Sequence, residues 1–154
     1  AAAAFCGASW YTQQYTGPGA NHALIDVGAT AQVSQQIGDA LTKVYSFDFA
    51  RLDENEKAAR AVITPEFQQQ FDQIFADVRA RAPQQQAVVT ATIAQSGVRE
   101  LTGDTAVLVV FMDQLATRAT TQEGQPQQLA SAGRLTVTAK KVDDVWKIAD
   151  VKAV

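Results

Sequence analysis

The chain has 154 residues, of which 47% are hydrophobic and 19% charged, and its formal net charge at pH 7 is −3. This length and composition fit one globular domain with a hydrophobic core, and the acidic balance provides no basic surface for nucleic acid or anionic lipid. A single cysteine, Cys6, and a single histidine, His22, exclude an intrachain disulfide and a metal site of cysteine and histidine ligands. We therefore expect no metal, no cofactor and no nucleic-acid partner.

The first residues, AAAAFCGASWYTQQY, are small and apolar before Trp10 and Tyr11. Aromatic residues at the edge of an apolar run are typical of the outer end of a membrane-spanning helix, although the run is far shorter than the ~20 residues of a complete span. We expect residues 1–16 to be the C-terminal end of a membrane anchor, with Phe5, Trp10 and Tyr11 at the membrane. A trimmed signal segment or an ordinary chain end are the alternatives. Residues 17–29, which begin with Gly-Pro-Gly, are expected to be a linker.

A domain over residues 30–154 is predicted to start with an amphipathic helix. Thr30 is a suitable N-cap, and one apolar stripe follows at helical spacing. The stripe consists of Val33, Ile37, Leu41, Val44 and Tyr45. It continues towards Phe49, so we expect the helix to include the stretch SFDF, with Tyr45 and Phe49 facing the core and Asp48 facing solvent. The alternative for Asp48 is a catalytic carboxylate in an apolar pocket.

Two further helices are predicted. Asp53-Glu54-Asn55-Glu56 has the spacing of a capping box, which favours a short helix over residues 54–62. In Thr64-Pro65-Glu66, Thr64 is expected to be an N-cap and Pro65 the first helical residue. The apolar positions Phe67, Phe71, Ile74, Phe75 and Val78 form the stripe of this third helix. Pro83 is expected to end it.

After residue 86 the pattern becomes one of alternating, strand-like residues. Four strands joined by short connections are expected over residues 87–98, 105–117, 133–142 and 145–151, with a polar loop around residues 124–126. Sequential strands of this kind form an antiparallel meander. The second strand is apolar on both faces, which predicts that helices or a partner cover each face. The sequence therefore predicts an α+β fold, with three helices packed on a curved, mainly antiparallel four-stranded sheet shaped like a cone.

No catalytic motif stands out. Asp113, late in the second strand, is a second candidate for a buried acid, and solvent exposure is the more frequent state of such a residue. His22 lies in the N-terminal segment and is expected to be a polar loop residue. Six aromatic residues are expected to form the core or line an apolar pocket: Tyr45, Phe49, Phe71, Phe75, Phe111 and Trp146.

Six stretches together resemble the Mce-associated (mammalian-cell-entry-associated) membrane proteins of actinobacteria. They are the membrane-edge start, SFDFARLDE, TPEFQQQF, QQQAVVTATIAQSGV, GDTAVLVVFMDQ and VDDVWKIADVKAV. The resemblance implies a single-pass protein of the cell membrane, with an extracytoplasmic domain similar to nuclear transport factor 2. It also implies an accessory role in Mce systems, which move lipids across the cell envelope, and no accepted catalytic residue.

Three hypotheses follow. The first is a non-enzymatic, membrane-anchored accessory or scaffold subunit whose partners are Mce transporter subunits or other envelope membrane proteins. The second is a small lipid- or sterol-binding carrier, which requires a continuous apolar cavity. The third is an enzyme of the ketosteroid-isomerase type, which requires a buried carboxylate and an oxyanion donor. Asp48 or Asp113 with Tyr45 would have to supply these groups.

Overall fold

The computed structural model describes residues 20–119 and 126–154. These ranges contain, in chain order, α2 (Val27–Tyr45), β1 (Phe47–Asp48), the 3-10 turn η1 (Phe49–Arg51), α3 (Leu52–Arg60), α4 (Pro65–Gln85), β2 (Val88–Thr102), β3 (Thr105–Arg118), β4 (Gln127–Val142) and β5 (Val145–Ala153). The strands form one five-stranded sheet in the order β1-β2-β3-β4-β5, and neighbouring strands are antiparallel. The predicted α+β fold is confirmed, with one more strand than expected.

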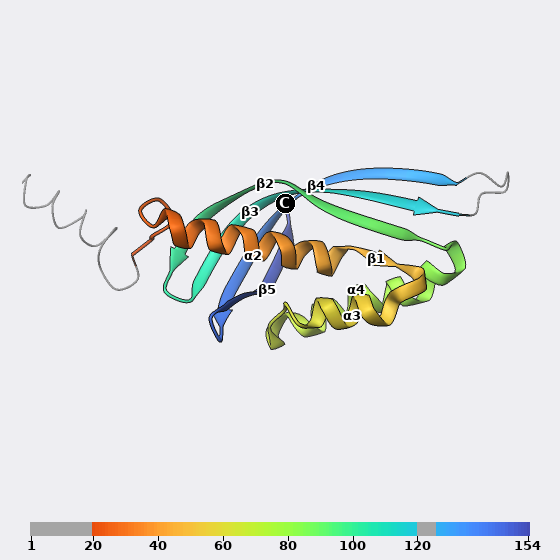
Figure 1. Cartoon of the computed structure of the whole chain (residues 1–154), viewed down its shortest axis with the longest axis horizontal. Helices are drawn as coiled ribbons and strands as arrows, with labels where there is room; N and C mark the ends of the chain where they lie inside the picture. The colour runs from red at the N-terminus through yellow and green to blue at the C-terminus, as the bar shows by residue number, and fades with distance from the viewer. Residues whose placement is uncertain (1–19, 120–125) are drawn as a thin grey trace, which may run out of the picture.

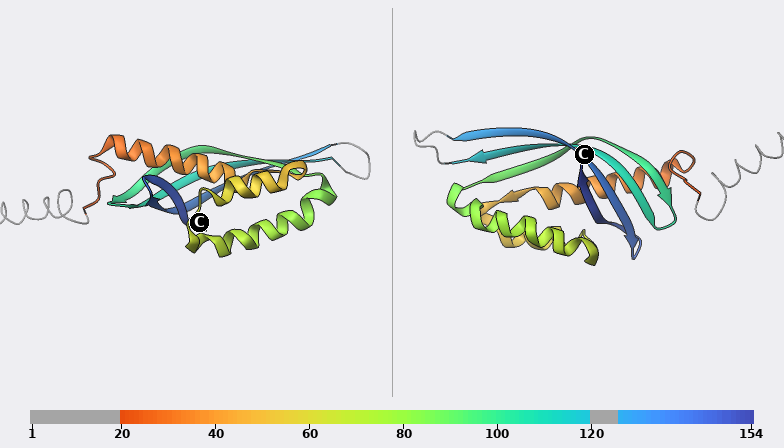
Figure 2. Two further views of the ribbon diagram at one scale, coloured as in Figure 1. Left: turned by 60° about the horizontal axis from the view of Figure 1, so that its bottom comes forward. Right: turned by 180° about the vertical axis from the view of Figure 1, so that it is seen from behind.

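The sheet is strongly bent, and the three helices lie on its concave side (Figures 1 and 2). Strand β2 pairs with β3 through two register shifts, between Ile93 and Gln95 and between Val98 and Glu100. Such bulges bend and twist a strand locally. Beyond the bend, the second half of β3 and the first half of β4 extend away from α2 (Figure 1). We call these paired segments, residues 110–118 and 127–134, the arm.

The core lies between the concave face of the sheet and the apolar stripes of α2 and α4. Its fully buried side chains include Val33, Ile37, Leu41, Phe67, Phe71, Leu108, Val110, Val137 and Ile148. Alternation in β4 and β5 is as predicted, because Leu135, Val137, Ala139, Trp146 and Ile148 are all buried. Helix and sheet periodicities thus meet on one apolar interior.

The N-terminal edge of the domain differs from the prediction. Helix α2 starts at Val27, and the cap is Asp26, whose Oδ1 accepts from Ala29 N at 2.9 Å. Thr30, the expected cap, instead donates its hydroxyl to the Ala23 carbonyl at 2.8 Å. Asn21, in the expected linker, donates to the Arg99 carbonyl on β2 at 2.9 Å. The described part of that segment therefore packs on the sheet.

The expectation that SFDF ends a helix is wrong. Helix α2 stops at Tyr45, and Phe47 and Asp48 form β1, which pairs with Val89 and Val88 of β2. Ser46 enables this change because its Oγ accepts from Ala91 N, at the edge of β2, at 2.9 Å. Extended backbone also suits a bulky aromatic residue that packs on a sheet.

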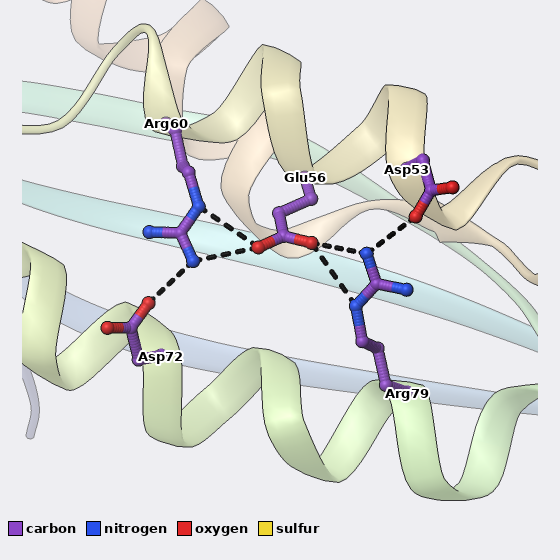
Figure 3. A network of polar contacts seen from close by, with 5 residues as sticks. All are labelled: Asp53, Glu56, Arg60, Asp72 and Arg79. Atoms are coloured by element: carbon purple, nitrogen blue, oxygen red, sulfur yellow. Dashed lines mark hydrogen bonds and ion pairs between the residues drawn. The ribbon is translucent and has the colours of Figure 1, made fainter.

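The predicted capping box does not form. Helix α3 starts at Leu52, and its N-cap, Arg51, makes no side-chain cap. Figure 3 shows that Asp53 and Glu56 point instead towards Arg60 and Arg79. Glu56 accepts from Arg60 Nη2 at 2.7 Å and from Arg79. Glu56 here gains bonds from two guanidinium groups, whereas a capping box would give it one bond to a backbone N–H, so the network takes its carboxylate from the cap.

The predicted end of the third helix is also too early. Helix α4 runs through Pro83 to Gln85, and Gln86 ends it in the left-handed conformation with φ of 46°. A proline in the last turn removes only one hydrogen bond to a preceding carbonyl. Ala87 N then donates to the Ala82 carbonyl at 3.0 Å, which brings the chain directly into β2.

Candidate interaction surface

Asp48 has a structural task at the corner between α2 and α3. Its carboxylate accepts from Ala50 N at 2.9 Å and lies 3.7 Å from Arg51 Nε. Its side chain is 28% exposed. The side chain therefore caps η1, and this task accounts for an acid between two phenylalanines.

Asp113 lies exposed on the convex face of β3. Its neighbour Gln114 faces the other side, where Gln114 Nε2 donates to the Tyr45 carbonyl at 3.2 Å. Tyr45 is partly buried there, and burial raises the pKa of its hydroxyl. Since successive residues of a strand point to opposite faces, Asp113 and Tyr45 lie on opposite sides of β3. The structure therefore does not bring together Asp113 and Tyr45, one of the two acid–donor pairs that the isomerase hypothesis names.

The six aromatic candidates fall into three groups. Phe71, Phe75 and Trp146 are buried, and the rings of Phe71 and Phe75 stack with centroids 5.4 Å apart. Tyr45 and Phe49 are partly buried and pack against the core. Phe111, expected in the same core or pocket, is instead 45% exposed on the outer face of β3. Phe111 stays uncovered because no helix among the described residues lies on the convex side of the sheet.

The outer face of the arm and the adjoining part of β2 carry a shallow groove, here called the outer groove, which is lined by both apolar and polar side chains. Two adjoining hollows of about 490 and 520 Å³ share Asp113 and Ala132. Phe111 borders one hollow and Leu115, which is 44% exposed, lines the other. Register places Ala130 beside Leu115 and Ala132 beside Asp113, so small side chains leave the larger ones prominent. Clustered exposed apolar residues of this kind mark interaction sites.

A second, smaller hollow of about 190 Å³ lies between α4 and the inner face of the arm. Phe47, Val78 and Val89 line it, with Arg81 and Arg118 also contributing. Its volume is below the ~300–1,000 Å³ typical of ligand pockets. The outer groove is therefore the more prominent candidate surface.

Part of this surface lies outside the predicted strands. The sequence predicts the apolar outer face of residues 105–117, but Ala130 and Ala132 precede the predicted third strand, which starts at residue 133. The double apolar character of residues 105–117 was the available indication that one face meets something other than the helices of its own domain.

The predicted membrane contacts Phe5, Trp10 and Tyr11 lie outside the described residues. None of the helices in the described ranges is long and apolar enough to cross a membrane. Within the same ranges, no three histidine, cysteine, aspartate or glutamate side chains are grouped so as to hold a metal ion.

Comparison with known proteins gives relatives in sequence and in fold. No family model matches the chain. It is 31% identical over 124 residues to the uncharacterized protein Rv1362c of Mycobacterium tuberculosis strain H37Rv, and the match covers 80% of this chain and 54% of that protein. The same values hold for the uncharacterized protein MT1407 of strain CDC 1551. The chain thus spans about half the length of these curated relatives.

Solved structures show the fold more clearly. CagV of Helicobacter pylori, a VirB8 homolog of a type IV secretion system, superposes with a TM-score of 0.66 at 13% identity, covering 80% of this chain and 97% of CagV. VirB8 of Agrobacterium tumefaciens gives 0.62 at 11%, covering 80% and 90%. A periplasmic fragment of TraM gives 0.59 at 11%, covering 82% and 98%. The chain therefore has the fold of VirB8 and of nuclear-transport-factor-2-like domains.

Proposed function

We propose that this chain is the extracytoplasmic scaffold domain of a membrane-anchored accessory subunit, without catalytic activity, that stabilises or assembles an Mce-type lipid import system. The observation that carries the proposal is the fold that the chain shares with VirB8 and with CagV, which is a VirB8 homolog of a type IV secretion system. The likeness to a periplasmic fragment of TraM supports a place outside the cytoplasm.

The tasks of the candidate carboxylates support a non-enzymatic role. Asp48 caps a turn, and Asp113 is exposed on the convex face, away from Tyr45. A general base must be free to take a proton from a bound substrate. The Asp48 carboxylate is engaged by Ala50 N and Arg51, and Asp113 is exposed to solvent.

The filled interior favours a scaffold over a lipid carrier. A carrier needs a continuous apolar cavity beside Phe71, Phe75 and Trp146. Phe71 is 0% exposed and stacks on Phe75, and Arg60 and Arg79 lie over the two rings at 5.2 Å from each centroid. These side chains occupy the space that an acyl chain would need.

The outer groove of the arm is the surface that we propose for the protein partner. Phe111 and Leu115 face solvent there, and neither side chain is needed by the core of the domain. Removing exposed apolar area from water favours association. A membrane subunit with a complementary apolar ridge would thus bind to this face.

The test is affinity purification of the full-length protein from its native membranes in mild detergent, followed by mass spectrometry. We expect transporter subunits in the eluate, and their loss from a variant that carries both Phe111→Ser and Leu115→Ser. Val145→Ser is the matched control because Val145 is 46% exposed on β5, off the arm. A protein without partners that carries bound lipid would contradict the scaffold and favour the carrier.

A further inference from the structure

Strand β4 pairs with β3 along its whole length but with β5 along only half of it. Gln127–Val142 pairs with Thr105–Arg118 and its turn on one side. On the other side β5 ends where Ala153 pairs with Leu135 and Val154 N donates to the Arg134 carbonyl at 3.0 Å. Residues 127–133 are all exposed, and no strand of the described ranges pairs with this side of them. We call residues 127–133 the open edge.

Two hydrogen bonds elsewhere on β4 identify the backbone groups of the open edge that face outwards. Lys141 N donates to the Asp104 carbonyl on the β3 side, while the Arg134 carbonyl accepts on the β5 side. Backbone groups alternate in direction along a strand, and the β3–β4 register contains no shift. The N–H and C=O groups of Gln128, Ala130 and Ala132 therefore point out of the open edge.

The opposite edge of the sheet is treated differently. On β2, the Asn21 side chain binds Arg99 O and Leu101 N, and Ser46 Oγ accepts from Ala91 N. Folded proteins normally block exposed edges with such contacts, or with charges, prolines or bulges. The open edge, with the sequence QQLASAG, contains no charge and no proline, and its pairing with β3 contains no bulge. An unprotected edge of this kind is suited to pairing with another strand.

We propose that two copies of this chain pair through their open edges, antiparallel and centred on Ala130, to form a homodimer with one continuous sheet. In this register Ala130 lies opposite Ala130 of the second copy, and Gln128 opposite its Ala132. All three outward-facing residues of each copy then pair with an outward-facing residue of the other. Every N–H and C=O group of the open edge that points outwards obtains a partner.

The side chains fit a strand that meets its own copy. A residue close to a two-fold axis faces its own equivalent, so a charge there would be opposed by the same charge. Residues 127–133 carry no charge. On the inner face, Leu129, which is 44% exposed, would lie opposite Ser131 of the second copy and diagonal to its Gly133. The small residues leave room for the two leucines.

The ends of the open edge set the size of the assembly. Arg134 already binds Val154 through its carbonyl, and at the other end Pro126 has no N–H to donate. Pairing is thus limited to residues 127–133. It uses the open edge of both copies, so the assembly closes at two. Because both copies contribute to one sheet, their outer grooves remain on the same side and accessible. The dimer does not depend on the proposed transporter role.

Sedimentation velocity on the 154-residue chain, in mild detergent and across a dilution series, tests the proposal. We expect a reversible monomer–dimer equilibrium. Ala130→Pro removes an outward N–H without touching a bond to β3, since an edge strand tolerates proline at such a position. Loss of the two symmetric hydrogen bonds should weaken the dimer about tenfold or more. A wild-type chain that is monomeric throughout, or forms larger species only, would overturn the proposal.

A charge exchange keeps the test independent of the proline variant. Ala130→Lys alone and Ala130→Glu alone should each weaken the dimer by about two- to fivefold, because like charges lie directly opposite. A 1:1 mixture of the two should dimerise more strongly than either one. Ala94, an exposed alanine at the β2 bulge, provides the control pair Ala94→Lys and Ala94→Glu, which should behave as wild type. Equal dimerisation of the Ala130 variants alone and mixed would place the contact elsewhere.

Discussion

At the scale of single residues, Glu56 connects helix α3 to helix α4. Its two oxygens bind Arg60, from its own helix, and Arg79, from α4 (Figure 3). Arg60 also binds Asp72 at 2.6 Å, and Arg79 binds Asp53 at 2.7 Å. Because each guanidinium also lies over a buried phenylalanine ring, one carboxylate positions two cation–π contacts.

We predict that Glu56→Gln lowers the free energy of unfolding by about 1 kcal/mol at neutral pH, since it removes the charge from a network of partly exposed pairs. Urea denaturation monitored by tryptophan fluorescence measures this difference. Glu54→Gln is the control, because Glu54 is exposed on the same helix and forms no ion pair with a described residue. Equal effects of the two substitutions would show that the network contributes nothing specific.

The same carboxylate gives a pH dependence of known sign. Hydrogen bonds from Arg79 and Arg60 hold the pKa of Glu56 below its ordinary value of 4.5. A lowered pKa in the folded state contributes stability that is present above pH 4.5 and is lost as the pH falls through the folded value. The stability difference between wild type and Glu56→Gln should therefore shrink below that pH. Denaturation curves at a series of pH values measure it, and a difference that stays constant would contradict the assignment.

Two phenylalanines of the sheet and helix layers provide a matched comparison. Phe71 is 0% exposed and Phe111 is 45% exposed. Replacing a buried phenylalanine by alanine leaves a cavity and costs about 3–5 kcal/mol, whereas an exposed position is usually within about 0.5 kcal/mol of wild type. We therefore expect Phe71→Ala to unfold at much lower denaturant concentration and Phe111→Ala to unfold like wild type. Equal destabilisation would place Phe111 in the core after all.

At the scale of secondary-structure elements, periodicity predicted most of the fold and competition between hydrogen bonds explains the errors. The apolar stripes of α2 and α4 and the alternation in β4 and β5 depend on burial alone, which the residue types encode. Helix ends depend on which partner a polar side chain finds in three dimensions. Asp53 and Glu56 could have capped α3, but Arg79 is 26 residues from Asp53 in the chain. No local pattern contains that partner.

The open edge differs from the prediction for another reason. The third strand is predicted to start at residue 133, and residues 127–132 before it are polar or small and show no alternation. They form a strand because β3, from Arg118 to Asp113, supplies hydrogen bonds to alternate residues of this segment. A strand that is exposed on both faces and at one edge buries little, so composition does not reveal it. The candidate outer groove could be predicted only through its β3 side.

The side chain of Asn21 attaches the first described residues to β2, and a substitution tests this contact. Asn21 accepts from Leu101 N and Ala23 N and donates to the Arg99 carbonyl. Asn21→Ala should open this end of β2, and amide hydrogen exchange at Leu101 should accelerate about fivefold or more for the loss of roughly 1 kcal/mol per hydrogen bond. His22→Ala is the control, because residue 22 binds the Leu101 carbonyl through its backbone N–H at 2.7 Å. Unchanged exchange in Asn21→Ala would mean that other contacts hold the segment.

At the scale of the whole molecule, the bent sheet divides the domain into a part covered by helices and an arm that extends beyond α2 (Figure 2). Stability follows burial, so the arm should open at lower free energy than the core. In the monomeric form, obtained by dilution of Ala130→Pro, amide exchange should alternate along the arm. Gln128 and Ala132 point outwards and should exchange rapidly, while Leu129 and Ser131 donate to β3 and should be about tenfold or more slower. In the wild-type dimer the alternation should disappear, because the second copy protects the outward amides.

Hydrogen–deuterium exchange measured by NMR resolves each residue. Uniform rates in the monomer would contradict the assigned direction of the backbone groups, and persistent alternation in a dimer would show that the two copies meet elsewhere.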